Sequence, residues 1–394
     1  MKYRFVAVVV LLIMCWLELS TLAVTAPTSD EPTYLVRGYA FVTRGKDRIA
    51  SCDPCSPVLS GWLIGAGLLL EPDLKLPAED DPIWRAGAGF DVHEVFMWAN
   101  SVPPQRIAFW GRLPIIFVSL LLGAFIYRWA SRRSGALPAL GALAFYVFCP
   151  NMLAHSRLAT TDALAAAAIL VSAYAFDQAL ERPRRATLVG SGVALGLALA
   201  TKISAVWLPV AFALQSALRA WQNRVDRRAV TTPLKTLLVS YVVSGLTLWA
   251  IYQFTFGPIE PGGIPVPAPA YWGDWQSTVE YLKNPVPSYL LGQISNRGWW
   301  YYYPIAFLIK TPLPVLILGL LGLVQTIRAR SWARDLPLLL TPGLYMISLL
   351  VSPHDLGYRY LLPLLPFIFV YGAGVVAAAR HARWSRIAMG LLLA

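Results

Sequence analysis

The 394-residue sequence is 57% hydrophobic, only 14% of its residues are charged, and its net charge is +12. Soluble domains usually carry about a quarter charged residues, so this composition excludes a soluble globular protein and predicts an all-α polytopic membrane protein. The positive charge lies in short clusters between apolar runs, as topology signals do, and not on a continuous face that would bind nucleic acid. We therefore expect membrane lipids, and no nucleic acid, among the partners.

The apolar runs predict about eleven transmembrane helices, since a helix needs about 20 mostly apolar residues to cross a bilayer. The predicted spans are 5–26, 107–130, 136–150, 160–180, 186–200, 203–219, 234–256, 304–327, 336–352, 357–379 and 384–394. Several are short for a full crossing, and 186–219 could form two short helices or one broken hairpin. We interpret the first span as a retained signal anchor rather than a cleaved signal peptide. The last span stops at Ala394, which favours an incomplete sequence or an end inside the membrane.

Basic residues follow every second predicted span, and Arg132, Arg184 and Arg328 are examples. Such positive connections face the cytoplasm. The alternate connections then face outward, and they are the long loops 27–106 and 257–303 and the short segments 150–159, 201–202 and 352–356. We expect a multi-pass protein of the inner (plasma) membrane with its site on the periplasmic or extracellular face.

Both long outer loops carry segments suited to the membrane interface. The apolar run 58–70 is too short to span a bilayer and favours an interfacial helix. The aromatic run 299–303 is either an anchoring belt or a wall that faces the substrate. Cys52 and Cys55 form a CxxC in the first loop. Because no second cysteine or histidine pair lies nearby, a local disulfide or two free thiols are favoured over a zinc or redox site.

Ionisable residues gather on the predicted outer face. Asp30 and Glu31 directly follow the first span, in a chain whose other acidic residues are expected to stay out of the membrane. The same face receives Arg112, His155, Arg157, Asp162, Lys202, His354, Asp355 and Arg359. Structural alternatives exist: Asp162 could cap a helix, the arginines could pair with carboxylates, and His155 could be a satisfied hydrogen-bonder. Lys202 fits such an alternative poorly, because a lysine that sets topology would prefer the cytoplasmic side.

The combination of these residue types has a chemical logic. Carboxylates can act as a general base toward a hydroxyl or an amine. Fixed cations can hold an anionic leaving group such as phosphate, whose charge develops as the bond breaks. A phosphate carried on a lipid would enter sideways between helices, so the residues predict a site at the membrane face.

At these residues the sequence resembles a known family. The segments that carry the resemblance are 30–39, 109–114, 150–162, 196–205, 292–304, 310–312 and 357–363. They look like the motifs of the dolichyl-phosphate-mannose protein mannosyltransferase-like enzymes of the GT-C superfamily. The similarity is to the bacterial type, which is related to lipid-A aminoarabinose transferases, and the matches run in order along the chain.

The resemblance implies a single GT-C domain over 1–394 and a glycosyltransferase, mannosyltransferase-like, that uses a polyprenyl-phosphate-linked sugar. The acceptor would be a protein, a lipid or a glycan, and one displacement step would invert the anomeric centre. It further implies a role for each candidate residue. The catalytic residues would be Asp30, Glu31 and Asp162; the donor-phosphate ligands would be Lys202 and Arg359, with Arg112 and Arg157 as weaker candidates; and His155 would be a weak acceptor or metal contact.

No cofactor is implied with certainty. A divalent metal is compatible with Asp30, Asp162 and His155, which are hard or borderline ligands, but nothing in the sequence fixes their spacing. Two other functions remain open. A membrane transporter or lipid flippase would also use intramembrane charges, and a non-catalytic subunit of a membrane complex would not need the acidic residues.

Overall fold

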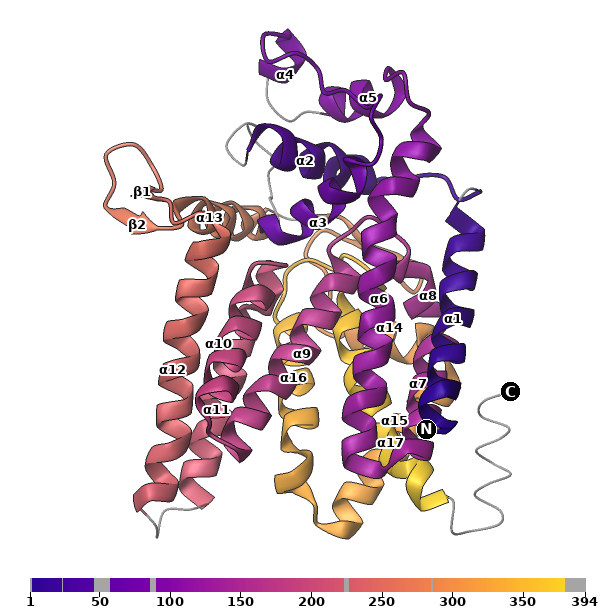
Figure 1. Ribbon diagram of the computed structural model, residues 1–394, viewed down its shortest axis with the longest axis vertical. Helices are drawn as coiled ribbons and strands as arrows, with labels where there is room; N and C mark the ends of the chain where they lie inside the picture. The colour runs from indigo at the N-terminus through magenta and orange to yellow at the C-terminus, as the bar shows by residue number, and fades with distance from the viewer. Residues whose placement is uncertain are drawn as a thin grey trace.

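The computed structural model describes residues 2–22, 24–45, 57–85, 90–222, 227–284 and 286–379. These residues form a bundle of helices with a layer of shorter elements over one end (Figure 1). Six helices of the described chain are long and apolar enough to cross a membrane, or eight if each of two bent pairs counts as one span. The predicted all-α membrane class is therefore confirmed, whereas the count of about eleven spans is not. The predicted span 384–394 and the pair Cys52 and Cys55 lie outside the described residues.

The bundle contains most of the helices. They are α1 (Lys2–Leu22), α6 (Pro104–Ser134), α7 (Ala136–Val147), α8 (Pro150–Ser156), α9 (Asp162–Glu181), α10 (Arg185–Leu199), α11 (Trp207–Gln222), α12 (Arg227–Ile251), α14 (Tyr302–Lys310), α15 (Leu313–Ala329), α16 (Trp332–Leu350) and α17 (Leu365–Ala379). Two short 3-10 segments, η2 (Ile203–Val206) and η3 (Tyr358–Leu364), precede α11 and α17.

Two of the predicted spans are broken. The span at 136–150 bends by 63° between α7 and α8, and the span at 304–327 bends by 113° between α14 and α15. Pro150 begins α8 and Pro312 precedes α15. Proline lacks an N–H and disfavours helical geometry in the residue before it, which explains both breaks. The region 186–219 forms two elements that both pack against α12: the short apolar helix α10, and a candidate span that begins in η2 and continues through α11.

The first outer loop covers one end of the bundle. Its helices are α2 (Glu31–Arg44), α3 (Val58–Leu68), α4 (Pro82–Arg85) and α5 (Phe90–Trp98), and Figure 1 shows them around the upper end of α6 and above α9. The helix expected at 58–70 is thus present as α3. It packs backbone to backbone against α2, because a Cβ on Gly65 would lie 2.1 Å from the carbonyl oxygen of Gly38.

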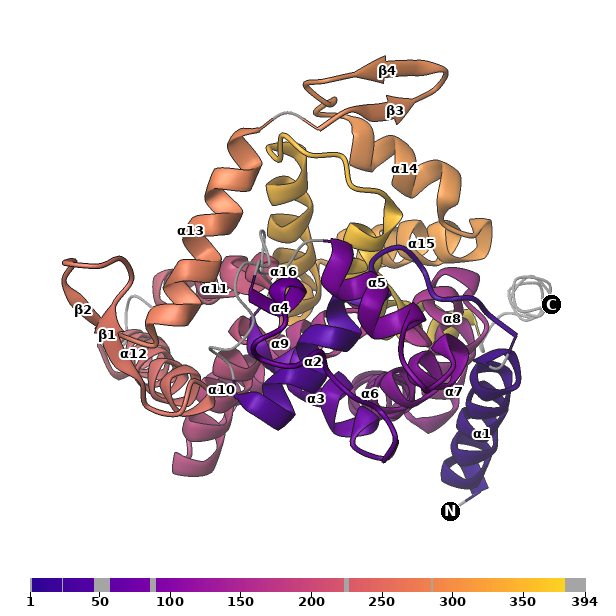
Figure 2. The same ribbon diagram turned by 90° about the horizontal axis from the view of Figure 1, so that it is seen from above.

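The second outer loop holds α13 (Pro269–Lys283) between two antiparallel hairpins. The first pairs β1 (Phe256–Pro258) with β2 (Pro265–Pro267), and the second pairs β3 (Ser288–Leu290) with β4 (Gln293–Ser295). Seen from above in Figure 2, α13 runs from the first hairpin toward the second along one side of the molecule. Both outer loops therefore lie at the same end of the bundle.

Basic residues meet at the opposite end. Arg133 at the end of α6 donates to the carbonyl of Arg334 in α16, and Arg334 donates back to the carbonyl of Arg133. Arg133 also forms an ion pair with Asp335. In Figure 1 this junction of α6 and α16 lies at the bottom, away from α2 and α13.

The membrane helices do contain acidic residues, contrary to the expectation from the sequence. Glu18 in α1 is 1% exposed and Asp177 in α9 is 3% exposed. Neighbouring helices supply their partners: the Ser119 hydroxyl donates to the Glu18 carboxylate at 3.0 Å, and an Arg219 nitrogen lies 3.8 Å from Asp177. A carboxyl group is tolerated inside a bundle where such partners exist.

Candidate functional site

The candidate residues converge at the end of the bundle covered by the outer loops. Asp30 precedes α2, Asp162 is the first residue of α9, Lys202 lies in the turn between α10 and η2, and Arg359 lies in η3. These four positions come from separate parts of the chain. The bundle brings their side chains together as two ion pairs.

The first pair joins Asp162 and Lys202. The Lys202 ammonium donates to a carboxylate oxygen of Asp162 at 2.6 Å, and the two side chains are 13% and 5% exposed. Burial would lower the pKa of Lys202, but the Asp162 carboxylate and nearby tyrosine hydroxyls outweigh burial and hold this pKa above its ordinary value. The helix-capping alternative for Asp162 is not the observed arrangement, since Thr161 is the N-cap residue of α9.

The second pair joins Asp30 and Arg359. A guanidinium nitrogen of Arg359 donates to a carboxylate oxygen of Asp30. These side chains are 41% and 31% exposed, so this pair is far more accessible than the first. An accessible ion pair is weak in water, which means that another anion can replace the carboxylate at little cost.

Tyr360 joins the two pairs. The Lys202 ammonium lies 4.3 Å from the centre of its ring, and the Arg359 guanidinium carbon lies 5.7 Å from it. Both distances are within the range of cation–π attraction. No role was predicted for Tyr360, although it lies in the segment 357–363 that carries the family resemblance.

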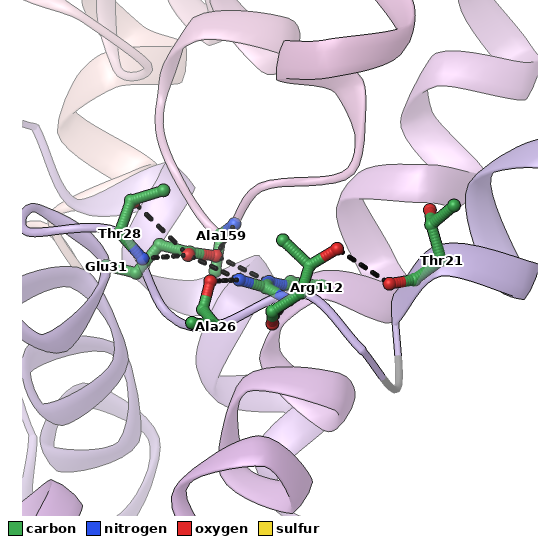
Figure 3. Close-up of polar contacts among 7 residues, drawn as sticks. Thr21, Ala26, Thr28, Glu31, Arg112 and Ala159 are labelled. Atoms are coloured by element: carbon green, nitrogen blue, oxygen red, sulfur yellow. Dashed lines mark hydrogen bonds and ion pairs between the residues drawn. The ribbon is translucent and has the colours of Figure 1, made fainter.

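Glu31 and Arg112 form a separate, fully buried pair beside this site. Figure 3 shows the Arg112 guanidinium between the Glu31 carboxylate and the carbonyl of Ala26, with the Ala159 backbone next to the same carboxylate. Two guanidinium nitrogens donate to the two Glu31 oxygens at 2.7 Å each. The backbone N–H groups of Thr28 and Ala159 also donate to Glu31.

The Glu31–Arg112 pair holds in place the chain segments next to Asp30 and Asp162. Burial would raise the pKa of Glu31, but Arg112 and the backbone donors outweigh burial and hold the pKa below its ordinary value. Because Glu31 is adjacent to Asp30 and accepts from Ala159, the pair links the start of α2 to the segment that leads into Asp162. All polar atoms of the Glu31 carboxylate are engaged in this arrangement.

His155 lies near the end of α8, and Arg157 directly follows this helix. A guanidinium nitrogen of Arg157 donates to the Thr21 hydroxyl of α1. Arg157 therefore faces α1 in this structure. His155 is half-buried and lies within electrostatic range of Asp162 and Lys202.

Among its described residues, the site does not have a ready set of metal ligands. No group of three or more His, Cys, Asp or Glu side chains in the described part of the chain is arranged to hold a metal ion. Asp30 and Asp162 are each engaged with a cation instead.

Comparisons with known proteins support a relationship for the central part of the chain. Residues 107–249 match the family model described as dolichyl-phosphate-mannose-protein mannosyltransferase. This region includes five of the candidate residues, namely Arg112, His155, Arg157, Asp162 and Lys202. No curated protein sequence matches the chain significantly.

Solved structures share the fold over almost the whole chain. ArnT from Cupriavidus metallidurans in the apo state has a TM-score of 0.64 at 15% identity, covering 100% of this chain and 64% of ArnT. The same protein bound to undecaprenyl phosphate has a TM-score of 0.59 at 17% identity, covering 99% and 62%. The oligosaccharyltransferase AglB from Archaeoglobus fulgidus, in complex with an inhibitory peptide and a dolichol-phosphate, has a TM-score of 0.60 at 12% identity, covering 98% and 52%.

These structural matches confirm the predicted GT-C fold, and the family-model match is confined to residues 107–249. The chain spans less than two thirds of the length of the solved structures that it resembles.

Proposed function

We propose that this chain, which has the GT-C fold and is homologous over residues 107–249 to dolichyl-phosphate-mannose-protein mannosyltransferases, is an integral membrane glycosyltransferase. It transfers a sugar from a polyprenyl-phosphate-linked donor to a protein, lipid or glycan acceptor. The observation that carries the proposal is the meeting of two carboxylate–cation pairs at the ring of Tyr360.

Lys202 and Arg359 are the proposed ligands of the donor phosphate. Both cations lie near the ring of Tyr360, and we assign both of them to one donor phosphate. Arginine can donate two hydrogen bonds to a phosphate, and such charge-assisted bonds are stronger than neutral ones. The phosphate would take the place of Asp30 on Arg359, where the existing pair is accessible.

Asp30 is the proposed general base. Once the donor phosphate occupies Arg359, the Asp30 carboxylate is free to accept a proton from the acceptor hydroxyl or amine. The acceptor oxygen or nitrogen attacks the anomeric carbon, and the bond between this carbon and the phosphate oxygen breaks. The electron pair leaves with the phosphate, whose charge Lys202 and Arg359 stabilise. A single displacement of this kind inverts the anomeric centre.

The remaining candidates have supporting roles in this proposal. Asp162 holds the Lys202 ammonium in place through their 2.6 Å contact. Glu31 and Arg112 position Asp30 and the segment before Asp162, because their polar atoms are hydrogen-bonded to each other and to the nearby backbone. Arg157 would reach the phosphate only after leaving Thr21, and His155 would contact the acceptor.

The site is proposed to face the periplasm or the exterior of the inner (plasma) membrane. Arg133 and Arg334 lie at the opposite end of the bundle, and basic residues favour the cytoplasmic side. A donor whose lipid lies in the membrane can reach the site without entering the cytoplasm. No nucleotide sugar is required.

The direct test is sugar transfer by the purified protein in proteoliposomes. Radiolabelled mannosyl and aminoarabinosyl polyprenyl phosphates are offered as donors, with a membrane extract as the source of acceptors. We expect transfer from one of them by the wild type, and loss of transfer in Asp30→Asn. Asp335→Asn is the matched control, because it also removes a carboxylate paired with an arginine, but at the opposite end of the bundle. Undiminished transfer by correctly folded Asp30→Asn would contradict the role of Asp30, and no transfer by the wild type from either donor would contradict the function.

A further inference from the structure

A short segment between α16 and η3 connects Arg359 to the second outer loop. The segment 351–357 ends at Gly357, which has a positive φ of 96° and precedes η3. Two ionisable residues in it, His354 and Asp355, are 1% and 9% exposed. Neither has a role in the proposed reaction, although both lie within five residues of Arg359.

Asp355 binds the backbone of the second outer loop just before α14. One of its carboxylate oxygens, Oδ2, accepts a hydrogen bond from the Trp299 N–H at 2.8 Å. The preceding residue, Gly298, has a positive φ of 63°, and a Cβ at this position would lie 2.6 Å from the same oxygen. The loop approaches Asp355 closely enough that only glycine fits without a shift.

His354 binds the other side of the same loop. Its Nε2–H donates to the carbonyl of Asn284 at 2.7 Å, at the end of α13. The ring of Tyr281 in α13 contacts the imidazole edge to face, with the ring centres 4.7 Å apart. The segment 351–357 is therefore held by both α13 and the chain that enters α14.

Tyr303 completes the anchor from α14. Its hydroxyl donates to the carbonyl of His354 at 3.0 Å and accepts from the N–H of Leu356 at 3.3 Å. The two bonds fix the backbone on either side of Asp355. With Tyr358 bound through its hydroxyl to Thr311 at 2.7 Å, the approach to Arg359 is constrained at successive positions.

We propose that His354 and Asp355 are positioning residues that hold η3 so that Arg359 faces the donor phosphate. Through them the second outer loop sets the affinity for the polyprenyl-phosphate donor. The inference rests on the proposed function, since it assigns a consequence to the placement of Arg359. A merely structural anchor would stabilise the loop without changing how Arg359 binds an anion.

The variant Gly298→Ala tests the anchor without removing a charged residue. Its methyl group must displace Asp355, with the Pro353 carbonyl 3.3 Å away as well. Gly292→Ala is the matched control, because Gly292 also has a positive φ, of 87°, but has no neighbouring atom within 4 Å of an added Cβ. Both substitutions therefore carry similar backbone strain, and only one disturbs Asp355.

The measurement is the affinity of the full chain in nanodiscs for undecaprenyl phosphate, by microscale thermophoresis. We expect Gly298→Ala to weaken binding about tenfold, which is a typical size for the coupling between neighbouring residues. Gly292→Ala should leave the affinity within about twofold of the wild-type value. In the Arg359→Ala background, Gly298→Ala should cause no further loss, because the anchor acts through Arg359. This non-additivity separates a positioning role from a general structural one.

Asp355→Ala and Asp355→Asn provide a second pair if Gly298→Ala does not fold. The asparagine keeps an oxygen acceptor for the Trp299 N–H and should retain most of the affinity, whereas alanine should not. The inference is overturned if Gly298→Ala or Asp355→Ala binds undecaprenyl phosphate as tightly as the wild type. It is also overturned if the substitution weakens binding equally in the wild-type and Arg359→Ala backgrounds. Either result would leave the proposed function intact. Absence of binding by the wild type would overturn the proposed function and the inference with it.

Discussion

At the scale of residues, charge compensation defines the candidate site. Asp162 and Lys202 are mutually buried, whereas Asp30 and Arg359 are accessible. The sequence predicted that these residues share a face, because topology and motif order place them there. It could not predict their pairing, since partners far apart in the chain are chosen by the packing of helices. The position of Tyr360 between the two cations was not predicted for the same reason.

Replacing Asp30 with Asn separates its two proposed roles. The variant should lose transfer because the base is absent. Its affinity for undecaprenyl phosphate should stay equal or rise by up to about fivefold, because exposed ion pairs contribute about 0.2–1 kcal/mol and Arg359 no longer needs to leave its partner. Binding titrations on the variant check this. Markedly weaker binding would show that Asp30 supports the phosphate site rather than competing for it.

Glu31 should matter for stability. Glu31→Gln leaves the buried Arg112 guanidinium without a charged partner, which typically costs about 3–5 kcal/mol. Glu280→Gln is the control, because its pair with Lys283 is 64% and 63% exposed and such pairs contribute about 1 kcal/mol or less. Denaturant titration in detergent measures both. Equal losses in the two variants would contradict the assigned difference.

The same pair predicts an acid-sensitive stability. The pKa of Glu31 in the folded protein is below its ordinary value of 4.5, so the unfolded chain binds the proton first. Its stabilisation is complete above about pH 4.5 and is lost as the pH falls through the lower, folded pKa. The difference in unfolding free energy between the wild type and Glu31→Gln should shrink over that window. A difference that is constant down to the folded pKa would contradict the predicted linkage.

At the scale of elements, α3 supports the turn that carries Lys202. The Leu59 N–H donates to the carbonyl of Ala200, and the Ser60 hydroxyl donates to the carbonyl of Thr201, both at 3.1 Å. The sequence predicted a short helix here from its apolar length. It could not predict this contact, because hydrophobic periodicity carries no information about a partner about 140 residues away. The bends at 148–149 and 311–312 were also missed, although Pro150 and Pro312 were the signals.

Close packing of α2 on α3 should be sensitive to one methyl group. Gly65→Ala places a Cβ 2.1 Å from the Gly38 carbonyl oxygen, and such overpacking typically costs about 1–3 kcal/mol. Gly190→Ala in α10 is the control, because an added Cβ meets nothing within 4 Å there and alanine favours a helix by about 1 kcal/mol. Thermal unfolding in detergent should show destabilisation only for Gly65→Ala. If Gly65→Ala melts at or above the wild-type temperature, the close approach is not as described.

At the scale of the whole molecule, composition and basic clusters predicted a polytopic helical protein with two outer loops on one side. The observed loops do share one end of the bundle, and the junction of Arg133 with Arg334 lies at the other. The number of spans was predicted less well, because short apolar helices such as α10 resemble crossings in sequence. Their length and bends become apparent only in three dimensions.

The proposed orientation can be tested by cysteine labelling. In a chain whose native cysteines are replaced, Gly292→Cys and Ala329→Cys present exposed thiols at the two ends of the bundle. An impermeant maleimide should label position 292 in intact right-side-out vesicles, and position 329 only after permeabilisation, because basic connections face the cytoplasm. The reverse pattern would place the candidate site inside the cell.

Photocrosslinking with undecaprenyl phosphate tests the central claim most directly. A photoactivatable form with the reactive group beside the phosphate is bound to the wild-type protein, and the adducts are mapped by mass spectrometry. The account predicts adducts around Lys202 and Arg359, displaced by unmodified undecaprenyl phosphate and reduced in Lys202→Ala and Arg359→Ala. Adducts concentrated instead at the opposite end, around the pocket lined by Arg133, Asp335 and Tyr371, would contradict it.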